Sequence, residues 1–310
     1  MVQENIIKNK ILIICGPTAS GKSDLAIQCA KLLNSEIISA DSMYIYRGLN
    51  IGTAKPTIEE MQGVKHHLID VVDANNTFTV SDYKKIAEPI LENLIAQGKT
   101  PIICGGTGFY INSLLYDLSY GNGNENTKIR EKYKKLAQEQ GNIAVFNVLK
   151  EVDPESASKL HFNDVKRVVR ALEIYENGTK KSDIQDSFAP KYDYLAFSIN
   201  HTRETLYKRI NCRVDLMIKN GLIDEIDNLV KNGINKENQC MQAIGYKEFF
   251  EYLDGNCTLQ NAIDNVKLNT RHYAKRQITF FKKLPNLQLL EPNDTYTLAQ
   301  KIVNAFNERI

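Results

Sequence analysis

The most constraining feature of this sequence is a glycine-rich segment directly after an apolar run. Residues 11–15 read ILIIC, and residues 16–23 read GPTASGKS, which fits the pattern G-x-x-x-x-G-K-[ST]. A helix pattern follows, and its predicted buried face comprises Leu25, Ala26, Cys29, Leu32 and Leu33. Strand, glycine-rich turn and helix in this order are typical of a loop that binds a di- or triphosphate.

Each part of this loop has a physical role in holding phosphate. Gly16 and Gly21 let the backbone curl so that N–H groups point at phosphate oxygens. Lys22 adds a positive charge, Ser23 can hold Mg²⁺, and the start of the helix contributes the positive end of its dipole. The predicted phosphate-binding residues are Gly16, Pro17, Thr18, Ala19, Ser20, Gly21, Lys22 and Ser23.

Two further polar residues follow predicted strands: Asp41 after residues 36–40 and Thr107 after residues 101–106. Ligands of open α/β sheets bind beyond the carboxyl ends of the strands, so both residues could face the same crevice as Lys22. Asp41 could be a metal ligand, a general base or a cap for the turn that follows it. Thr107 could face the crevice or cap the helix that follows it.

Strand and helix signals alternate over the first ~115 residues, which predicts a parallel βαβ sheet. A third strand is predicted over 67–72, and a helix over 81–97 that buries Tyr83, Ile86, Ile90 and Leu94. After a polar loop, only helix patterns occur from 127 to 177, and a strand returns at 192–199. Beyond residue 200 the chain is predicted to be mostly helical, over 202–220, 222–232, 244–254 and 258–283.

These signals predict an α/β fold: a phosphate-loop parallel sheet core with a helical insertion and additional carboxyl-terminal helices. Residues 1–119 form the first part of the core, 120–185 the insertion, and 186–310 the rest of the core with its helices. At 310 residues, the chain is long enough for one large domain with an added module.

Composition excludes several classes of protein. A hydrophobic content of 43% with 25% charged residues is ordinary for a soluble globular protein, and a net charge of +2 does not indicate nucleic acid by itself. The amino terminus lacks the apolar core of a secretion signal, and no apolar run approaches the ~20 residues of a membrane span. We therefore expect a cytoplasmic protein with no membrane partner. The six cysteines and five histidines form no disulfide or zinc pattern.

Two basic clusters lie in the helical parts. Lys166 and Arg170 share a helix face, with Arg167 beside them. Residues 267–283 carry six Lys and Arg residues with interleaved aromatics and no Asp or Glu. Such a stripe suits a phosphate backbone with stacked bases. The alternative is an amphipathic helix with a solvated charged face.

Comparison of motifs separates the remaining phosphate-loop classes. An Asn-Lys-x-Asp guanine motif is missing, which argues against a regulatory GTPase, and Leu68-Ile69-Asp70 matches an ATPase motor poorly. A small-metabolite kinase that uses ATP remains possible, because Lys22, Ser23 and Asp41 would also serve phosphoryl transfer. A protein that only binds its ligand is the least favoured class.

Motifs spread over residues 10–290 resemble those of the tRNA dimethylallyltransferases. Besides the loop, they are ISADSMYIYRG at 38–48, NIGTAKP at 50–56, GGTGFY at 105–110, RVVRALE at 167–173, QAIGYK at 242–247 and KRQITF at 275–280. The resemblance implies transfer of the dimethylallyl group of dimethylallyl diphosphate to N6 of the adenosine 3′ of the anticodon, in tRNAs reading codons that begin with U. The absence of Cys/His pairs in the last residues resembles bacterial members without a zinc finger.

The resemblance also implies roles for individual residues. Thr18 would lie beside the leaving oxygen, Arg213 would be the catalytic arginine, and Asp41 would act as base or hold a water on Mg²⁺, the expected cofactor, near Ser23. The partners would be dimethylallyl diphosphate and the anticodon stem-loop, which the insertion would clamp, bound by a monomer. The tRNA-facing residues would be Asp41, Ser42, Met43, Tyr44, Thr107, Arg130, Lys166, Arg167, Arg170, Gln242, Gly245, Tyr246, Lys247, Lys275, Arg276 and Gln277.

Two other functions stay open. An adenine-nucleotide prenyltransferase would use the same chemistry, although the basic helix and the insertion argue against a mononucleotide acceptor. A kinase of a small metabolite is the alternative from another class. Residues 234–240 depart from the family pattern, which makes a role of Gln242 in base recognition less secure than that of Asp41.

Overall fold

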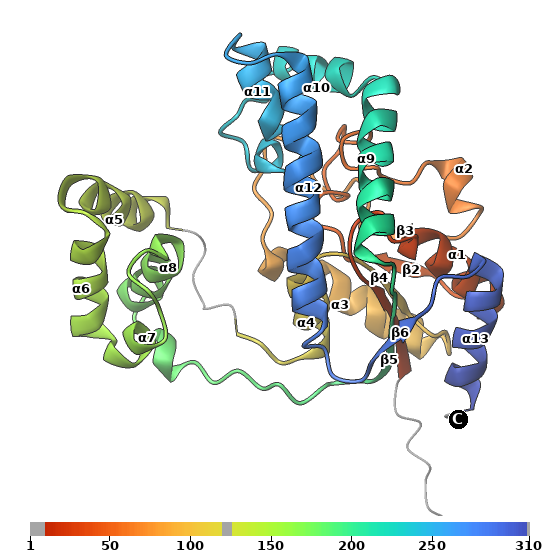
Figure 1. The fold of residues 1–310 in the computed structure, drawn as a ribbon. Coiled ribbons are helices and arrows are strands. Elements are labelled where there is room, and N and C mark those ends of the chain that lie inside the picture. Colours follow the sequence, from red (N-terminus) through yellow and green to blue (C-terminus); the bar gives the residue numbers. More distant parts are fainter. Residues whose placement is uncertain (1–9, 120–125, 309–310) are drawn as a thin grey trace, which may run out of the picture. The chain divides into compact units, whose positions relative to one another are not determined.

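The computed structural model describes residues 10–119 and 126–308 of the chain, which divide into two compact units. One unit contains the described residues up to Leu115 and from Lys191 onward, and the other spans Tyr116–Pro190. The first unit holds the sheet and the phosphate loop, and the second consists of helices (Figure 1).

A six-stranded parallel sheet forms the core of the first unit. Its order is β3-β2-β4-β1-β5-β6, and all neighbouring strands run parallel. At the centre, Ile13 of β1 pairs with Ile103 of β4 and Ala196 of β5. The predicted α/β parallel sheet is therefore confirmed. The strands are β1 (Lys10–Cys15), β2 (Ile37–Ser39), β3 (His66–His67), β4 (Ile102–Gly105), β5 (Asp193–Ile199) and β6 (Leu287–Leu290).

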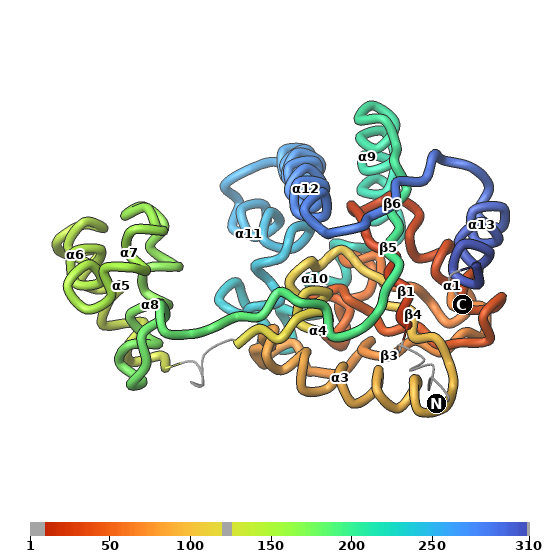
Figure 2. Tube along the Cα trace, turned by 90° about the horizontal axis from the view of Figure 1, so that it is seen from below, coloured from red at the N-terminus to blue at the C-terminus, as the bar shows by residue number. Residues whose placement is uncertain are grey.

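Helices cover both faces of this sheet (Figure 2). On one face α1 (Lys22–Leu32) packs with α13 (Thr295–Asn307), and on the other lie α3 (Val80–Ala96) and α4 (Gly108–Leu115). The predicted face of α1 is correct for its first three members, but Leu32 is exposed. The buried residues of α3 are Tyr83, Ala87, Leu91 and Leu94, so Ile86, which is exposed, was wrongly placed in the core.

The predicted strand over 67–72 is wrong. Pairing with β2 ends at His67, because Leu68 and Asp70 have φ values of 64° and 54°, which an extended strand cannot accommodate. Asp70 instead accepts a hydrogen bond from the buried ammonium of Lys55, which also donates to the Tyr46 carbonyl. The segment after His67 therefore leaves the sheet, and Asp70 pairs with Lys55 there.

The helices between β5 and β6 stand beyond the carboxyl ends of the strands (Figure 1). They match the predicted helical ranges to within a few residues, with α9 and α12 in contact. The prediction missed β6 and α13 at the end of the chain, which complete the sheet and cover α1. No described helix is long and apolar enough to cross a membrane. The remaining helices of this unit are α2 (Ile58–Met61), α9 (Arg203–Lys219), α10 (Leu222–Lys231), η2 (Gln239–Gln242), α11 (Lys247–Leu253) and α12 (Leu259–Phe281).

The second unit has its own small apolar core, formed around Tyr133, Val145, Leu149 and Leu172. Asp153 caps α7 by accepting the Ser156 N–H, and Pro154 takes the first helical position, which explains the break that the sequence shows there. The elements of this unit are α5 (Thr127–Gln140), α6 (Asn142–Val152), α7 (Pro154–Ser158), α8 (Val165–Glu176) and η1 (Lys181–Asp183).

Candidate active site

The glycine-rich segment forms the predicted loop between β1 and α1. Gly16 and Gly21 have φ values of 140° and 89°, which favour glycine. A Cβ on Gly16 would lie 2.5 Å from Ser198 Oγ, so a side chain there would displace the serine hydroxyl. The strand, turn and helix that the sequence predicts are therefore all present, with backbone N–H groups at the start of α1.

The loops after β2 and β4 meet next to the phosphate loop, because β4 lies between β1 and β2 in the sheet. Thr107 joins two of these loops: its hydroxyl accepts the Ser42 N–H at 3.0 Å and lies 3.3 Å from Ser42 Oγ. Its backbone N–H donates to the Ala40 carbonyl. Thr107 thus fixes the backbone beside Asp41, and its hydroxyl does not serve as a free ligand group.

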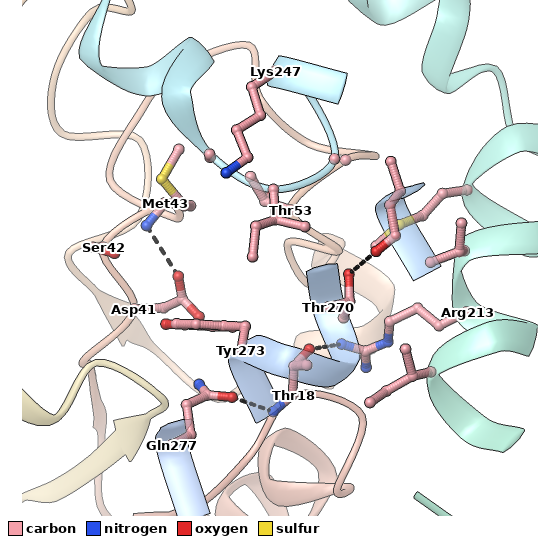
Figure 3. Close-up of a pocket in the computed structure, with 18 of the residues that line it drawn as sticks. Thr18, Asp41, Ser42, Met43, Thr53, Arg213, Lys247, Thr270, Tyr273 and Gln277 are labelled. Carbon is pink, nitrogen blue, oxygen red and sulfur yellow. Dashed lines mark hydrogen bonds between the residues drawn. The ribbon is translucent and has the colours of Figure 1, made fainter. Parts of the chain in front are cut away.

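A cavity of about 320 Å³ opens above these loops (Figure 3). One side is formed by the phosphate loop and α9, another by Asp41, Ser42 and Met43, and a third by the segments around Thr53 and Lys247. Helix α12 contributes Val266, Thr270, Tyr273, Arg276 and Gln277. The apolar part of the cavity wall consists of Ile210, Val214, Met217 and Val266. The charged residues of the wall are Lys22, Asp41, Arg213, Lys247 and Arg276.

A cluster of cations marks the phosphate-loop end of the cavity. Arg213 Nη1 lies 3.4 Å from Thr18 Oγ1, and Lys22 Nζ lies 3.4 Å from the Pro17 carbonyl oxygen. Burial lowers the pKa of Lys22 from its usual value, the Asp41 carboxylate opposes this shift, and Arg213 adds to it. Two cations that repel each other at one end of a cavity favour a bound polyanion, which would relieve the repulsion.

Asp41 faces the cavity and also makes a local turn. Its Oδ1 accepts the Met43 N–H at 3.0 Å, which is the capping role weighed from the sequence (Figure 3). The same carboxylate lines the cavity beside Tyr273, whose pKa is raised to about 12 by burial and then by the Asp41 charge. The turn thus holds the carboxylate in place, and the cavity leaves it available to a ligand.

Two predicted tRNA-facing residues are buried instead. Tyr246 is fully buried, and its hydroxyl donates to Glu225 at 2.7 Å, so its side chain supports the site without facing a ligand. Gln277 is 5% exposed, and its amide is occupied on both sides: Oε1 accepts the Thr18 N–H and Nε2 donates to the Gly106 carbonyl. A Cβ on Gly106 would lie 2.2 Å from that Nε2. Gln277 therefore positions the phosphate loop.

The other predicted tRNA-facing residues fall into three groups. Tyr44 is half-buried, and its hydroxyl donates to the Ala54 carbonyl. Arg130 and Arg170 in the second unit both pair with the carboxylate of Glu173, which is fully buried. The remaining residues line the cavity or lie exposed: Ser42, Met43, Gln242, Gly245, Lys247 and Arg276 line it, and Lys275 together with Lys166 and Arg167 of the second unit lies exposed.

Comparisons with known proteins place the chain in a family. A family model described as IPP transferase matches residues 44–284. The chain belongs to this family. A tRNA dimethylallyltransferase of Caldanaerobacter subterraneus subsp. tengcongensis is 47% identical over 303 residues, 96% of each chain. One from Clostridioides difficile is 46% identical over 278 residues, 89% of each chain.

Solved structures of the IPP transferase type share the fold. The tRNA isopentenylpyrophosphate transferase from Bacillus halodurans aligns with a TM-score of 0.73 at 39% identity, over 97% of this chain and 98% of its own. A structure of a eukaryotic dimethylallyltransferase acting on tRNA aligns with a TM-score of 0.78 at 32% identity, over 97% of this chain and 78% of its own.

A small hollow beside the cavity of this IPP transferase is lined in part by oxygen-bearing side chains. It is about 20 Å³ in size, and its lining includes Ser23, Ser39 and Asp41. The Ser39 hydroxyl is buried without a hydrogen-bond partner. Hydroxyl and carboxylate oxygens are hard ligands, and Mg²⁺ takes its other ligands from water and phosphate. No cluster of three metal-binding His, Cys, Asp or Glu residues exists within the described ranges.

Several residues that shape the site escaped sequence reasoning. Arg209 Nε donates to the Ala19 carbonyl at 2.7 Å, and His201 Nε2 lies 2.9 Å from the Ser20 carbonyl oxygen. Glu225 lies on α10 and accepts hydrogen bonds from the segment that carries Gly52. Each of these contacts spans more than 170 residues, so no local spacing indicates it.

Proposed function

We propose that this chain transfers the dimethylallyl group from dimethylallyl diphosphate to N6 of the adenosine 3′-adjacent to the anticodon, in tRNAs reading codons that begin with U. One observation supports this proposal most directly. Arg213 contacts Thr18 at one end of a cavity, and Asp41 lines the same cavity. The same cavity thus offers cations for a departing diphosphate and a carboxylate for an attacking amine.

The donor end of the cavity suits a diphosphate leaving group. As N6 attacks C1 of the dimethylallyl group, the C1–O bond breaks and its electron pair stays on diphosphate. Loop N–H groups, Lys22 and Arg213 stabilise that charge where it develops. The apolar side chains of Ile210, Val214 and Val266 surround the prenyl chain. Mg²⁺ held by Ser23 and Asp41, directly or through water, would neutralise diphosphate charge.

The acceptor side of the cavity suits an adenine amine. The lone pair of N6 is delocalised into the ring, which makes the amine a poor nucleophile. Asp41 accepts a hydrogen bond from N6 and then takes its proton as the new C–N bond forms. The turn to Met43 holds the carboxylate in position for this transfer.

A polynucleotide acceptor explains the basic residues around the site. The target base must leave the anticodon stack to reach the cavity, and the phosphates on either side need cations. Arg276 at the cavity and exposed Lys275 supply them from α12. We expect a monomer that acts on the anticodon stem-loop in the cytoplasm, with the helical unit as a clamp.

Three incubations test the proposal against its two alternatives. The protein is mixed with dimethylallyl diphosphate and unmodified anticodon stem-loop, with the same donor and AMP, or with ATP and a panel of metabolites. A matched stem-loop carries purine riboside, which lacks the 6-amino group, at the target position. Prenylation of the adenosine stem-loop alone supports the proposal. Prenylation of AMP, or ATP consumption that depends on a metabolite, would overturn it.

A further inference from the structure

The carboxylate of Glu225 on α10 gathers four hydrogen bonds. Its Oε2 accepts the backbone N–H groups of Asn50 at 2.8 Å and Ile51 at 2.7 Å. Its Oε1 accepts the Gly52 N–H at 3.0 Å and the Tyr246 hydroxyl at 2.7 Å. Three successive backbone N–H groups that converge on one anion form a nest, and each bond is strengthened by the charge.

These bonds join two segments that form the same wall of the cavity. Gly52 and Thr53 come from one segment, and Gly245 and Lys247 from the other. The close-up shows Thr53 and Lys247 directed into the cavity on the far side from Thr18 (Figure 3). Asp41 lies between these two groups of residues in the same view.

Packing between the two segments is tight enough to require glycine. A Cβ on Gly52 would lie 2.6 Å from the Tyr246 ring, and a Cβ on Gly245 would lie 3.2 Å from the Gly52 carbonyl oxygen. Burial and the nearby Glu225 charge raise the pKa of Tyr246, so its hydroxyl keeps the proton that it donates. The two backbones therefore meet directly, and the carboxylate is the polar group that both of them share.

We infer that Glu225 is a positioning residue for the acceptor: it fixes the wall formed by Gly52, Thr53 and Lys247 opposite the phosphate loop. This inference rests on the proposed transfer to tRNA. Glu225 is not part of the proposed donor site, because Thr18, Lys22 and Arg213 belong to other elements. Loss of its charge should therefore disturb the use of tRNA and leave the binding of dimethylallyl diphosphate intact.

The test compares three variants of the full chain. Glu225→Gln keeps the shape but replaces one acceptor oxygen by a donor, Tyr246→Phe removes one of the four bonds, and Asp224→Asn alters the exposed carboxylate next along α10 as a control. The readouts are kcat and KM for the stem-loop and for dimethylallyl diphosphate, thermal unfolding, and amide hydrogen exchange of residues 50–53. Binding of an unreactive dimethylallyl thiodiphosphate measures the donor site alone.

For Glu225→Gln we expect kcat/KM for the stem-loop to fall ~10- to 100-fold, since charged hydrogen bonds are lost to three backbone groups. The KM for dimethylallyl diphosphate and the thiodiphosphate affinity should stay within about threefold, and exchange at 50–53 should rise. Tyr246→Phe should give a smaller change in the same direction, and Asp224→Asn none.

The outcomes separate the two ideas. If wild-type protein does not prenylate the stem-loop, the proposed function is wrong, and the inference that rests on it is wrong as well. If wild type is active and Glu225→Gln matches Asp224→Asn in kcat/KM, only the inference is overturned. Equal losses for donor and acceptor, together with a lower unfolding temperature, would also overturn it, because they indicate general destabilisation.

Discussion

Arg213 on α9 reaches the hydroxyl of Thr18, with 3.4 Å between Nη1 and Oγ1, although 195 residues separate them in the chain. Helix α9 follows β5, which is the neighbour of β1 in the sheet. The order of the strands therefore places a cation from the second half of the chain next to the phosphate loop in the first half. This contact defines where a leaving group would develop negative charge.

Replacing Arg213 should impair the chemical step more than binding. We expect Arg213→Ala to lower kcat ~10²- to 10³-fold, because a preorganised cation at the leaving oxygen is lost. Single-turnover rates at saturating tRNA and donor would measure this. Thr18→Ser, which keeps the hydroxyl, should remain close to wild type, and combining Arg213→Ala with Thr18→Ala should cost less than the two separate losses together. Full additivity would contradict a joint role.

Replacing Asp41 should separate catalysis from recognition. Asp41→Ala should lower turnover ~10²-fold or more while tRNA binding stays within about tenfold, as for loss of a general base. Filter binding and single-turnover kinetics on the same preparation provide both numbers. A loss confined to binding would make Asp41 a recognition residue.

Exposed cations of α12 should contribute to the salt dependence of binding. Replacing both Lys275 and Arg276 with Ala should weaken tRNA affinity and flatten the salt slope by about two phosphate contacts. Lys301→Ala on α13 is the control, since that lysine is exposed but belongs to a helix outside the cavity wall. An unchanged slope would mean that α12 has only a solvated charged face.

Arg130 should act through the fold of the second unit. Glu173 is fully buried there, and although burial acts to raise its pKa, the paired Arg130 and Arg170 hold that pKa below the usual value. Because the pKa is depressed in the folded state, this contribution to stability is complete above the unfolded pKa and is lost as the pH falls below it. Breaking such a buried pair costs about 3 kcal/mol.

Amide exchange over residues 127–176 of the full chain checks this expectation. Arg130→Ala should speed exchange there at neutral pH, and exposed Lys128→Ala on the same helix should not. In wild type, exchange corrected for its own pH dependence should speed up on acidification. Normal protection in Arg130→Ala would show that the arginine is dispensable to this fold and return it to the candidate tRNA contacts.

Removing magnesium should stop transfer. We expect EDTA to abolish activity and added Mg²⁺ to restore it, because the diphosphate charge needs a hard cation. Ser23→Ala should raise the Mg²⁺ concentration for half-maximal activity about tenfold, as expected for loss of a group near the ion. Full activity in EDTA would rule out a metal requirement.

Local patterns predicted the parts of the site that depend on nearby residues. The loop at 16–23 follows from its spacing, and Asp41 and Thr107 could be placed near it because parallel strands end at the same edge. Of these two residues, Asp41 lines the cavity, whereas the Thr107 hydroxyl pairs with Ser42. The family resemblance pointed to Thr18 and Arg213, whose contact no local pattern indicates. The strand at 287–290 was missed because it is only four residues long and half-exposed.

Long-range hydrogen bonds explain most of what the sequence could not predict. Gln277 and Tyr246 sit in motifs that suggested direct contact with tRNA, but their polar groups are occupied by Thr18, Gly106 and Glu225. A sequence motif contains two kinds of residue: residues that contact the ligand and residues that position them. The motif itself does not distinguish the two kinds. Only the coordinates make that distinction.

The two hydrogen bonds of Gln277 tie a long helix to the turn after β1 and the turn after β4 at a single amide. A rotation or shift of α12 would break both bonds unless the turn with Thr18 moved with it. Arg276, the residue before Gln277, lines the same cavity, so ligands bound at either end of the cavity would lie against one helix.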